Sequence, residues 1–430
     1  KSNIGHLEPA SGIAGLIKLA LALHHGTIPP NVHFTKPNPR IPFEEYRLRV
    51  PTAVEPWKQP GADGLRYGGV NSFGFGGTNA HAVLSSAPEP AAQARGGSSA
   101  RPIIWSVSGR SAAALEELTR ADAEFLDATP AEALPDLAAA VQQRRSHHSH
   151  RIAVVGSSPA EVAKSLRGGA GHPGHFSGTL GTSAPPVAVV FTGQGTQWPG
   201  MARDLFQQNA RFRSTVEELD AIMRPHWGRS VVDDIIRGDG SVFRSDVGQG
   251  ILFVLQVGVY RLFREAGLQP MLVFGHSIGE AAAAYASGAL TIEDAVRVIV
   301  ERARVQELTR GSGAMAAVGI SEDAAQPLLE QYRDRLWIAA VNSPTDLTLA
   351  GESDAVKAAV ESLSKAGTFA RMLPFPYAFH SPKMDICYDS FMPSVKHIQP
   401  KATTIPYIST VTGTELPGES LDPDYWYRNL

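Results

Sequence analysis

Ser277 is the residue of this sequence with the clearest capacity for covalent chemistry. It lies in the pentapeptide GHSIG at 275–279, which follows an apolar run and precedes an alanine-rich stretch at 281–290. A strand that turns sharply into a helix needs glycine on both sides of the turn, because a side chain there would collide with the backbone. The turn would place the hydroxyl at a helix N-terminus, where backbone amides stabilise negative charge. The pattern therefore predicts a nucleophilic serine.

A nucleophilic serine needs a general base, and the sequence contains 14 histidines. His380 lies in PYAFHSP at 376–382, a few residues after the last strand of a predicted subdomain. A loop at this point of the chain could face the serine. Taken alone, a loop histidine is more often structural than catalytic, so the residue pattern leaves both interpretations open.

The segments that must position these groups alternate between apolar strands and helices from residue 187 onward, as in an α/β domain. Within this region, the β-α-β-β-α-β order at about 314–373 predicts an inserted ferredoxin-like subdomain. A smaller α/β unit is expected at about 101–168, with Ser111 as the N-cap of its first helix. Linker composition at 87–100 precedes that unit, and a glycine-rich stretch at 168–186 follows it.

Composition excludes several classes of protein. The 430 residues suffice for about three domains. The net charge of −3 gives no reason to expect nucleic acid or an anionic membrane as a partner. The single cysteine, Cys387, excludes a disulfide scaffold and suits a reducing cytoplasm. No apolar run reaches the roughly 18 residues that would span a bilayer. The start at Lys1, without Met or a signal stretch, predicts a segment of a longer protein.

Several motifs together resemble a known family. GHSIGE, preceded by GQGTQ at 193–197 and followed by GAMAAVG, VNSP and YAFHSP, resembles the acyltransferase domain of polyketide synthases over 187–430. Bacterial malonyl-CoA:carrier-protein transacylases are more distant relatives. The resemblance implies an α/β-hydrolase-like body with a ferredoxin-like insertion. It also implies that Ser277 is the acylated nucleophile and that His380 is its base, oriented by backbone carbonyls rather than by an acid.

The resemblance assigns further roles around the serine. The Ile278 amide and Gln194 would hold the oxyanion of the tetrahedral intermediate. Arg302, with Arg304 as the alternative, would pair with the free carboxylate of a dicarboxylic acyl group, which a planar guanidinium can grip through two parallel hydrogen bonds. The remaining expected neighbours are His276, Asn342 and, less strongly, Gln249 before a helix at 251–263.

The loop before the histidine bears on the choice of extender unit. Malonyl-selective relatives tend to carry HAFH and methylmalonyl-selective ones YASH, whereas this sequence has Tyr377-Ala378-Phe379-His380. Phe379 would crowd an α-methyl group, and Ile278 also favours malonyl. A methyl group in an apolar site is worth only about 1–3 kcal/mol, so the loop biases the choice. We therefore expect malonyl-CoA, with methylmalonyl-CoA as the alternative.

Two motifs near the start, KSNIGHLE at 1–8 and NSFGFGGTNAH at 71–81, resemble the closing part of a thiolase-fold β-ketoacyl synthase over 1–88. In that family Lys1 and His6 belong to the condensing site, whose cysteine lies upstream, so this piece is not expected to condense acyl groups alone. Residues 89–186 then correspond to the ketosynthase–acyltransferase linker. Its histidine-rich stretch at 146–151 allows a metal site or a polar turn; a polar turn is favoured because histidines this close cannot easily surround one ion.

The predicted reaction is a ping-pong transfer through an acyl-serine, from acyl-CoA to the phosphopantetheine thiol of an acyl carrier protein, in the cytoplasm. No bound cofactor or metal is expected, and no nucleic acid or membrane partner. The other partners would be the rest of the ketosynthase and synthase. Two alternatives remain: a serine hydrolase of the α/β class, and a non-catalytic scaffold that docks carrier proteins. The end at Leu430 predicts a truncated domain with weakened activity, because His380 would lack part of its support.

Overall fold

The chain forms two units, Lys1–Ser99 and Ala100–Leu430, each with its own contacts. The computed structural model describes residues 2–58, 64–87, 102–181 and 185–430. Among these residues, no helix has the length and apolar character required to cross a bilayer.

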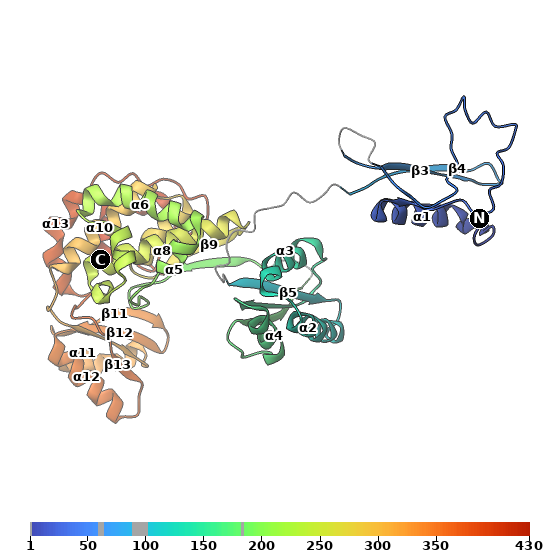
Figure 1. Cartoon of the computed structure of the whole chain (residues 1–430). Helices are drawn as coiled ribbons and strands as arrows, with labels where there is room; N and C mark the ends of the chain where they lie inside the picture. Colours follow the sequence, from blue (N-terminus) through green and yellow to red (C-terminus); the bar gives the residue numbers. More distant parts are fainter. Residues whose placement is uncertain (1, 59–63, 88–101, 182–184) are drawn as a thin grey trace. The chain divides into compact units, whose positions relative to one another are not determined.

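The first unit is built on an antiparallel hairpin. Strands β3 (Tyr67–Phe73) and β4 (Asn79–Ser85) pair throughout their length, and helix α1 (Ser11–His25) packs along them (Figure 1). The glycine motif at 71–81 forms the hairpin turn and its flanks, with Gly77 at a φ of 91°. The remaining elements are short: η1 (Glu8–Ala10), β1 (Thr27–Ile28) and β2 (Glu55–Pro56).

The second unit begins with a three-stranded antiparallel sheet in the order β5-β6-β7. Ser111 and Ser158 cap helices α2 and α4 by accepting backbone hydrogen bonds, so the expected N-cap at Ser111 is correct. Helix α3 and strand β7 were not expected. The glycine-rich stretch at 168–186 is therefore more than a spacer, because part of it pairs with β6. The bounds are β5 (Ile103–Gly109), α2 (Ala112–Asp127), η2 (Ala131–Ala133), α3 (Leu134–Arg144), β6 (His150–Gly156), α4 (Pro159–Gly168) and β7 (His175–Thr179).

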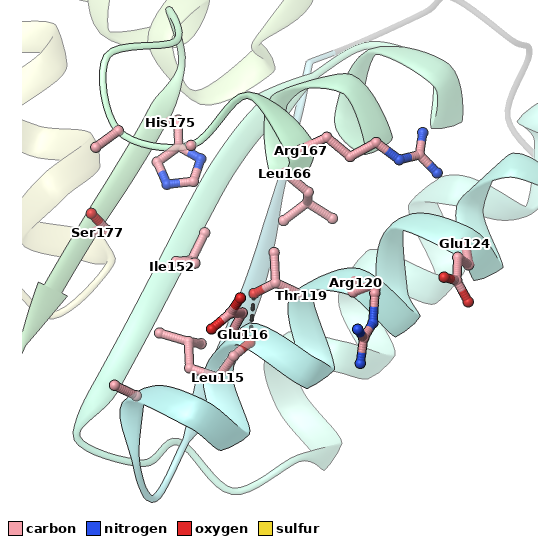
Figure 2. Close-up of a pocket in the computed structure, with 13 residues that line it drawn as sticks. Leu115, Glu116, Thr119, Arg120, Glu124, Ile152, Leu166, Arg167, His175 and Ser177 are labelled. Atoms are coloured by element: carbon pink, nitrogen blue, oxygen red, sulfur yellow. Dashed lines mark hydrogen bonds between the residues drawn. The ribbon is translucent and has the colours of Figure 1, made fainter.

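A groove of about 590 Å³ lies on this small domain between α2 and the strands β6 and β7 (Figure 2). Leu115, Ile152 and Leu166 give it an apolar floor, while Arg120 and Glu124 lie at its side. It shares no residue with the site predicted around Ser277.

The larger body has a four-stranded sheet in the order β15-β14-β9-β8. Strands β8, β9 and β14 are parallel, and β15 runs antiparallel to β14. Helices cover the sheet, and buried alanines of α9 let that helix approach it closely. The strands are β8 (Val187–Phe191), β9 (Pro270–Gly275), β14 (Tyr407–Ile408) and β15 (Glu415–Leu416). The helices are α5 (Arg203–Gln208), α6 (Ala210–Trp227), α7 (Val231–Arg237), η3 (Gly240–Phe243), α8 (Ser245–Glu265), α9 (Gly279–Ser287), α10 (Ile292–Glu307), η4 (Pro382–Cys387), α13 (Tyr388–Val395), η5 (Gly418–Ser420) and α14 (Pro423–Asn429).

The inserted subdomain has the ferredoxin-like topology that the sequence predicts. Its antiparallel sheet has the order β11-β12-β10-β13, and α11 and α12 lie together on one side of it (Figure 1). A separate apolar cluster fills the space between the helices and the sheet. The elements are β10 (Ala314–Val318), α11 (Glu322–Gln331), β11 (Leu336–Ser343), β12 (Asp346–Gly351), α12 (Ser353–Lys365) and β13 (Ala370–Met372).

Candidate active site

Ser277 lies on a tight turn between β9 and α9, with a φ of 53°. This is the left-handed region, which non-glycine residues seldom occupy. The flanking glycines permit the turn: a Cβ on Gly275 would lie 2.1 Å from the carbonyl carbon of Gly279, and one on Gly279 would lie 2.2 Å from the carbonyl oxygen of Phe191. The turn therefore has the shape of a nucleophile elbow, as the sequence predicts.

His380 reaches the serine from a distant part of the chain. Its Nε2 lies 2.8 Å from Ser277 Oγ, across a separation of 103 residues. His380 also has a positive φ, 58°, in the loop between β13 and η4. The distance is that of a hydrogen bond between a hydroxyl and a general base.

Arg302 makes the second contact to the nucleophile. Its Nη2 donates to Ser277 Oγ over 2.8 Å, and the residue is only 1% exposed. Arg304, the alternative in the sequence, instead pairs with Glu301 on the outside of α10. The structure thus distinguishes the two arginines: Arg302 faces the serine, whereas Arg304 belongs to the surface.

Two glutamines hold the other side of the Arg302 guanidinium. Arg302 Nη1 donates to Gln249 Oε1 over 2.7 Å and to Gln306 Oε1 over 3.0 Å. Gln249 lies inside α8 and not before a helix, so the predicted helix start at 251 is wrong. The glycines on either side of Gln249 lie within α8 and allow close packing: a Cβ on Gly250 would lie 2.4 Å from the Trp227 ring. Sequence reasoning missed Gln306, although it follows Arg302 by one helical turn.

Two further residues beneath the elbow had no predicted role. Asn429, in the C-terminal helix α14, donates from Nδ2 to the Ser277 carbonyl oxygen over 3.2 Å and to Glu280 Oε2 over 2.8 Å. Its Oδ1 accepts from Arg302 Nε over 3.3 Å. Glu280 also accepts from Thr410 and Tyr425, and it is fully buried. Glu280 follows the serine by three residues, but nothing in the sequence signals the Asn429 contacts, which span 127 to 152 residues.

Burial sets the electrostatics of the site. Desolvation, aided by the nearby Arg302 cation and by His276, lowers the pKa of His380 to about 3, while a hydrogen bond with the Asn429 backbone opposes this shift. His380 is therefore neutral, and able to accept a proton, at physiological pH. Burial also lowers the pKa of Arg302 to about 9, although the negative charge of Glu280 opposes this shift. The guanidinium therefore stays protonated at physiological pH. Burial raises the pKa of Cys387 to about 11, which keeps this thiol protonated.

The two residues expected to hold an oxyanion both lie near the elbow. The Ile278 amide precedes the first residue of α9, where backbone N–H groups have no partner within the helix. The loop that carries Gln194 packs closely on the elbow. A Cβ added to Gly193 would lie only 3.1 Å from the His276 carbonyl oxygen. Among the described residues, the buried Gln194 Nε2 finds no hydrogen-bond acceptor.

His276 and Asn342 also meet. His276 Nε2 lies 3.1 Å from Asn342 Oδ1, and the Asn342 amide donates to Thr348 Oγ1 over 3.0 Å. This contact connects the elbow in the larger body to β11 of the ferredoxin-like subdomain. His276 is adjacent to the nucleophile in the chain, and Asn342 contacts it through His276.

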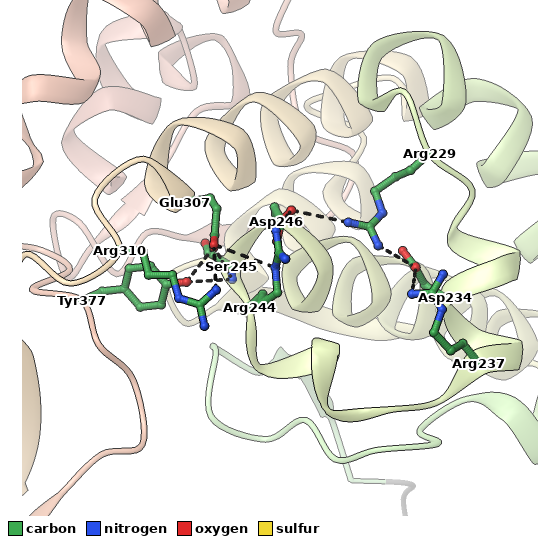
Figure 3. A network of polar contacts seen from close by, with 9 residues as sticks. All are labelled: Arg229, Asp234, Arg237, Arg244, Ser245, Asp246, Glu307, Arg310 and Tyr377. Atoms are coloured by element: carbon green, nitrogen blue, oxygen red, sulfur yellow. Dashed lines mark hydrogen bonds and ion pairs between the residues drawn. The ribbon is translucent and has the colours of Figure 1, made fainter.

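Tyr377 and Phe379 are held in a fixed arrangement before His380. Their rings stack with centroids 4.6 Å apart, and Tyr377 is fully buried. Figure 3 shows the Tyr377 hydroxyl directed at Glu307, to which it donates over 2.6 Å. The backbone amide of Ser245 also donates to this carboxylate, and Arg310 pairs with it. An ionic cluster thus anchors the loop that carries the predicted selectivity residues.

Two residues, Lys1 and His6, were predicted for a ketosynthase site. Lys1 lies outside the described residues, and His6 accepts through Nδ1 from the Glu8 amide in the first unit. In the second unit, His147 and His150 bond to separate partners, Gln142 and Thr179. Among the residues that the structure describes, no cluster of histidine, cysteine or carboxylate side chains could hold a metal ion.

Comparison with known proteins shows the family of this chain. The sequence profile described as the acyl transferase domain matches residues 188–430. This chain belongs to the acyl transferase family. Two further profiles match before this domain: the β-ketoacyl synthase C-terminal domain at 1–35 and the ketoacyl-synthetase C-terminal extension at 37–155. The chain thus joins ketosynthase C-terminal segments to an acyltransferase domain, and this domain is a transferase.

Similar proteins are modular synthases. The whole chain is 34% identical to erythronolide synthase EryA2 of Saccharopolyspora erythraea over 436 residues, which are 12% of that protein. It is 37% identical to the spectinabilin polyketide synthase system protein NorA of Streptomyces orinoci, of which it covers 23%. The chain therefore spans less than a quarter of these relatives.

Solved acyltransferase domains share the fold. The domain from module 8 of the salinomycin polyketide synthase is 32% identical, with a TM-score of 0.70 over 77% of this chain and 79% of that one. The domain of SpnD, solved in complex with 2-(pent-4-yn-1-yl)malonyl, is 30% identical, with a TM-score of 0.66 over 76% of this chain and 78% of that one. The predicted α/β class is confirmed.

Proposed function

We propose that this acyltransferase domain loads a malonyl unit from malonyl-CoA, through an acyl-serine, onto the phosphopantetheine thiol of an acyl carrier protein. The observation that carries the proposal is the meeting of Ser277 Oγ with both His380 Nε2 and Arg302 Nη2, each at 2.8 Å. One side chain can accept the serine proton, and the other supplies a buried cation for the free carboxylate of the acyl group.

The reaction would proceed in two equivalent halves. His380 takes the proton of Ser277 as Oγ attacks the thioester carbonyl, and the Ile278 amide and Gln194 stabilise the oxyanion. The tetrahedral intermediate collapses to malonyl-serine, and His380 returns the proton to the departing CoA thiolate. The carrier-protein thiol then attacks the acyl-serine by the reverse path. No step requires a metal or a bound cofactor.

Arg302 would select the acyl group by its free carboxylate. A guanidinium buried to this degree loses its solvation, and a carboxylate can restore the lost interactions through charge-assisted hydrogen bonds. His276 and Asn342 would orient neighbouring groups, and Gln249 would orient Arg302. Phe379, stacked on the anchored Tyr377, supports malonyl over methylmalonyl because a fixed ring leaves less room for an α-methyl group.

The proposed domain organisation, partners and cellular location follow from the same reaction. The domains would be a ketosynthase segment at 1–88, a linker at 89–186 and the acyltransferase at 187–430, with Lys1 and His6 belonging to the ketosynthase site. The remaining synthase domains and a carrier protein would be the partners. We place the reaction in the cytoplasm, because one cysteine in 430 residues suits a reducing compartment.

The fate of a radiolabelled malonyl group tests the proposal against hydrolysis and against a scaffold role. We expect the label to stay on the protein until phosphopantetheinylated carrier protein is added, and then to move to that thiol. Rapid release of free malonate would instead indicate a hydrolase. A protein that never takes up the label would indicate a scaffold.

A further inference from the structure

A buried pair, Glu280 and Asn429, connects the backbone of the nucleophile elbow to the guanidinium of Arg302. Glu280 and Asn429 are 0% and 4% exposed, respectively. The Asn429 side chain contacts both the Ser277 carbonyl and Arg302. The pair therefore lies between the two groups that must act on one substrate.

We propose that Glu280 and Asn429 are positioning residues that set the orientation of Arg302 relative to Ser277 and thereby determine the preference for acyl groups with a free carboxylate. The inference rests on the proposed function and assigns a role in it to residues that touch no reacting atom.

The orientation of the Asn429 amide is the first step of the argument. A carboxylate only accepts hydrogen bonds, so Glu280 Oε2 requires the NH₂ side of Asn429 to face it. The same NH₂ group reaches the Ser277 carbonyl oxygen. The amide oxygen is then left to face Arg302 Nε, which can only donate. Glu280 thus fixes the orientation of the Asn429 amide, so that the amide oxygen faces Arg302.

The second step concerns the guanidinium plane. Asn429 accepts from Nε, while Gln249 and Gln306 accept from Nη1. Because the guanidinium is planar, these contacts fix the direction of its remaining nitrogen, Nη2, which points at Ser277 Oγ. Nη2 is thus the nitrogen presented to the nucleophile and to a carboxylate beside it. Without the Asn429 contact, the plane would be held from the Nη1 side alone.

The charge of Glu280 also affects Arg302 directly. Its carboxylate acts on Arg302 in the direction that favours the protonated guanidinium, opposing the effect of burial. Four donors satisfy this carboxylate: the Thr410 amide and hydroxyl, the Tyr425 hydroxyl and the Asn429 amide. These hydrogen bonds offset the cost of burying the carboxylate, which acts on the cation used for substrate selection.

The test compares acyl-serine formation from malonyl-CoA, which has a free carboxylate, and from acetyl-CoA, which has none. Asn429→Leu removes the acceptor for Arg302 Nε at similar side-chain size. We expect it to lower the malonyl-to-acetyl ratio of kcat/KM by about 10- to 100-fold, mainly through the KM for malonyl-CoA, as for loss of a hydrogen bond to a charged group.

Tyr260→Phe is the matched control. It removes a buried hydroxyl that donates to the Ala286 carbonyl oxygen, outside the network of Glu280 and Asn429. We expect it to reduce thermal stability while the ratio stays at the wild-type value. Equal shifts in both variants would mean that the network only supports the fold, and an unchanged ratio in Asn429→Leu would overturn the proposal.

Glu280→Gln provides a second test if Asn429→Leu does not fold. A glutamine offers one acceptor oxygen where the carboxylate offered two, and it removes the charge that stabilises Arg302. The malonyl-to-acetyl ratio should fall here too, and a wild-type ratio would contradict the role of Glu280. Absence of malonyl-serine in the wild-type protein would be a different failure, that of the proposed function itself.

Discussion

Two glycine-rich turns carry the most distinctive motifs of this chain, and their surroundings differ sharply. The turn at 275–279 lies in a buried polar network that draws on four segments far apart in sequence. The turn at 71–81 joins two strands and has exposed side chains, including Phe75. Among the described residues of Lys1–Ser99, Leu23 alone is buried. Within this chain, the turn at 275–279 therefore has burial and side-chain partners that the turn at 71–81 does not have.

The strongest test of this contrast removes the central contact of the buried turn. Ser277→Ala and His380→Ala should each lower the rate of carrier-protein malonylation by roughly a thousandfold or more, since the two residues act as a unit. His81→Ala, in the exposed turn, should leave the rate unchanged. An equal loss in His81→Ala would show that the first unit takes part in acyl transfer.

The second test separates two arginines on one helix. Arg302→Ala should reduce kcat/KM for malonyl-CoA by about 10- to 100-fold, the range for loss of a hydrogen-bonded charged group. Arg304→Ala, which removes an ion pair at the surface, should change it little. Steady-state kinetics on both variants checks this, and comparable losses would contradict the assignment of the carboxylate partner to Arg302.

The third test uses pH. Because the pKa of His380 is lowered to about 3, the imidazole should stay neutral well below pH 6.5. Labelling of Ser277 by a fluorophosphonate should therefore show no fall with a midpoint near pH 6.5. Removing the cation in Arg302→Ala favours the imidazolium, so the fall in labelling should move to higher pH. A shift to lower pH would contradict the electrostatic coupling between the two residues.

The smallest expected effect concerns the side chain before the histidine. Phe379→Ala should raise the methylmalonyl-to-malonyl ratio of kcat/KM by about tenfold, because a methyl group contributes only about 1–3 kcal/mol. Phe369→Ala, at an exposed position of the ferredoxin-like subdomain, serves as the control. Competition between the two acyl-CoA substrates, read by mass spectrometry of the acyl-enzyme, measures the ratio. If the methylmalonyl-to-malonyl ratio in Phe379→Ala equals that of the wild type, Phe379 is not the basis for a malonyl preference.

Local patterns account for what the sequence could predict. The elbow, the strand and helix order of the ferredoxin-like subdomain and the Ser111 cap all follow from neighbouring residues. The sequence could not predict β7, whose HFSGT segment lies among glycines, or the helical position of Gln249 beside two glycines. Asn429 gave no signal at all, because its role depends on contacts with residues up to 152 positions away.

Intact-protein mass spectrometry after incubation with malonyl-CoA tests the central claim most directly. The wild-type protein should gain one malonyl group, and peptide mapping should place it on Ser277. The Ser277→Ala protein, folded to the same extent, should gain none. An adduct that persists in Ser277→Ala, or its absence from the wild type, would contradict the account.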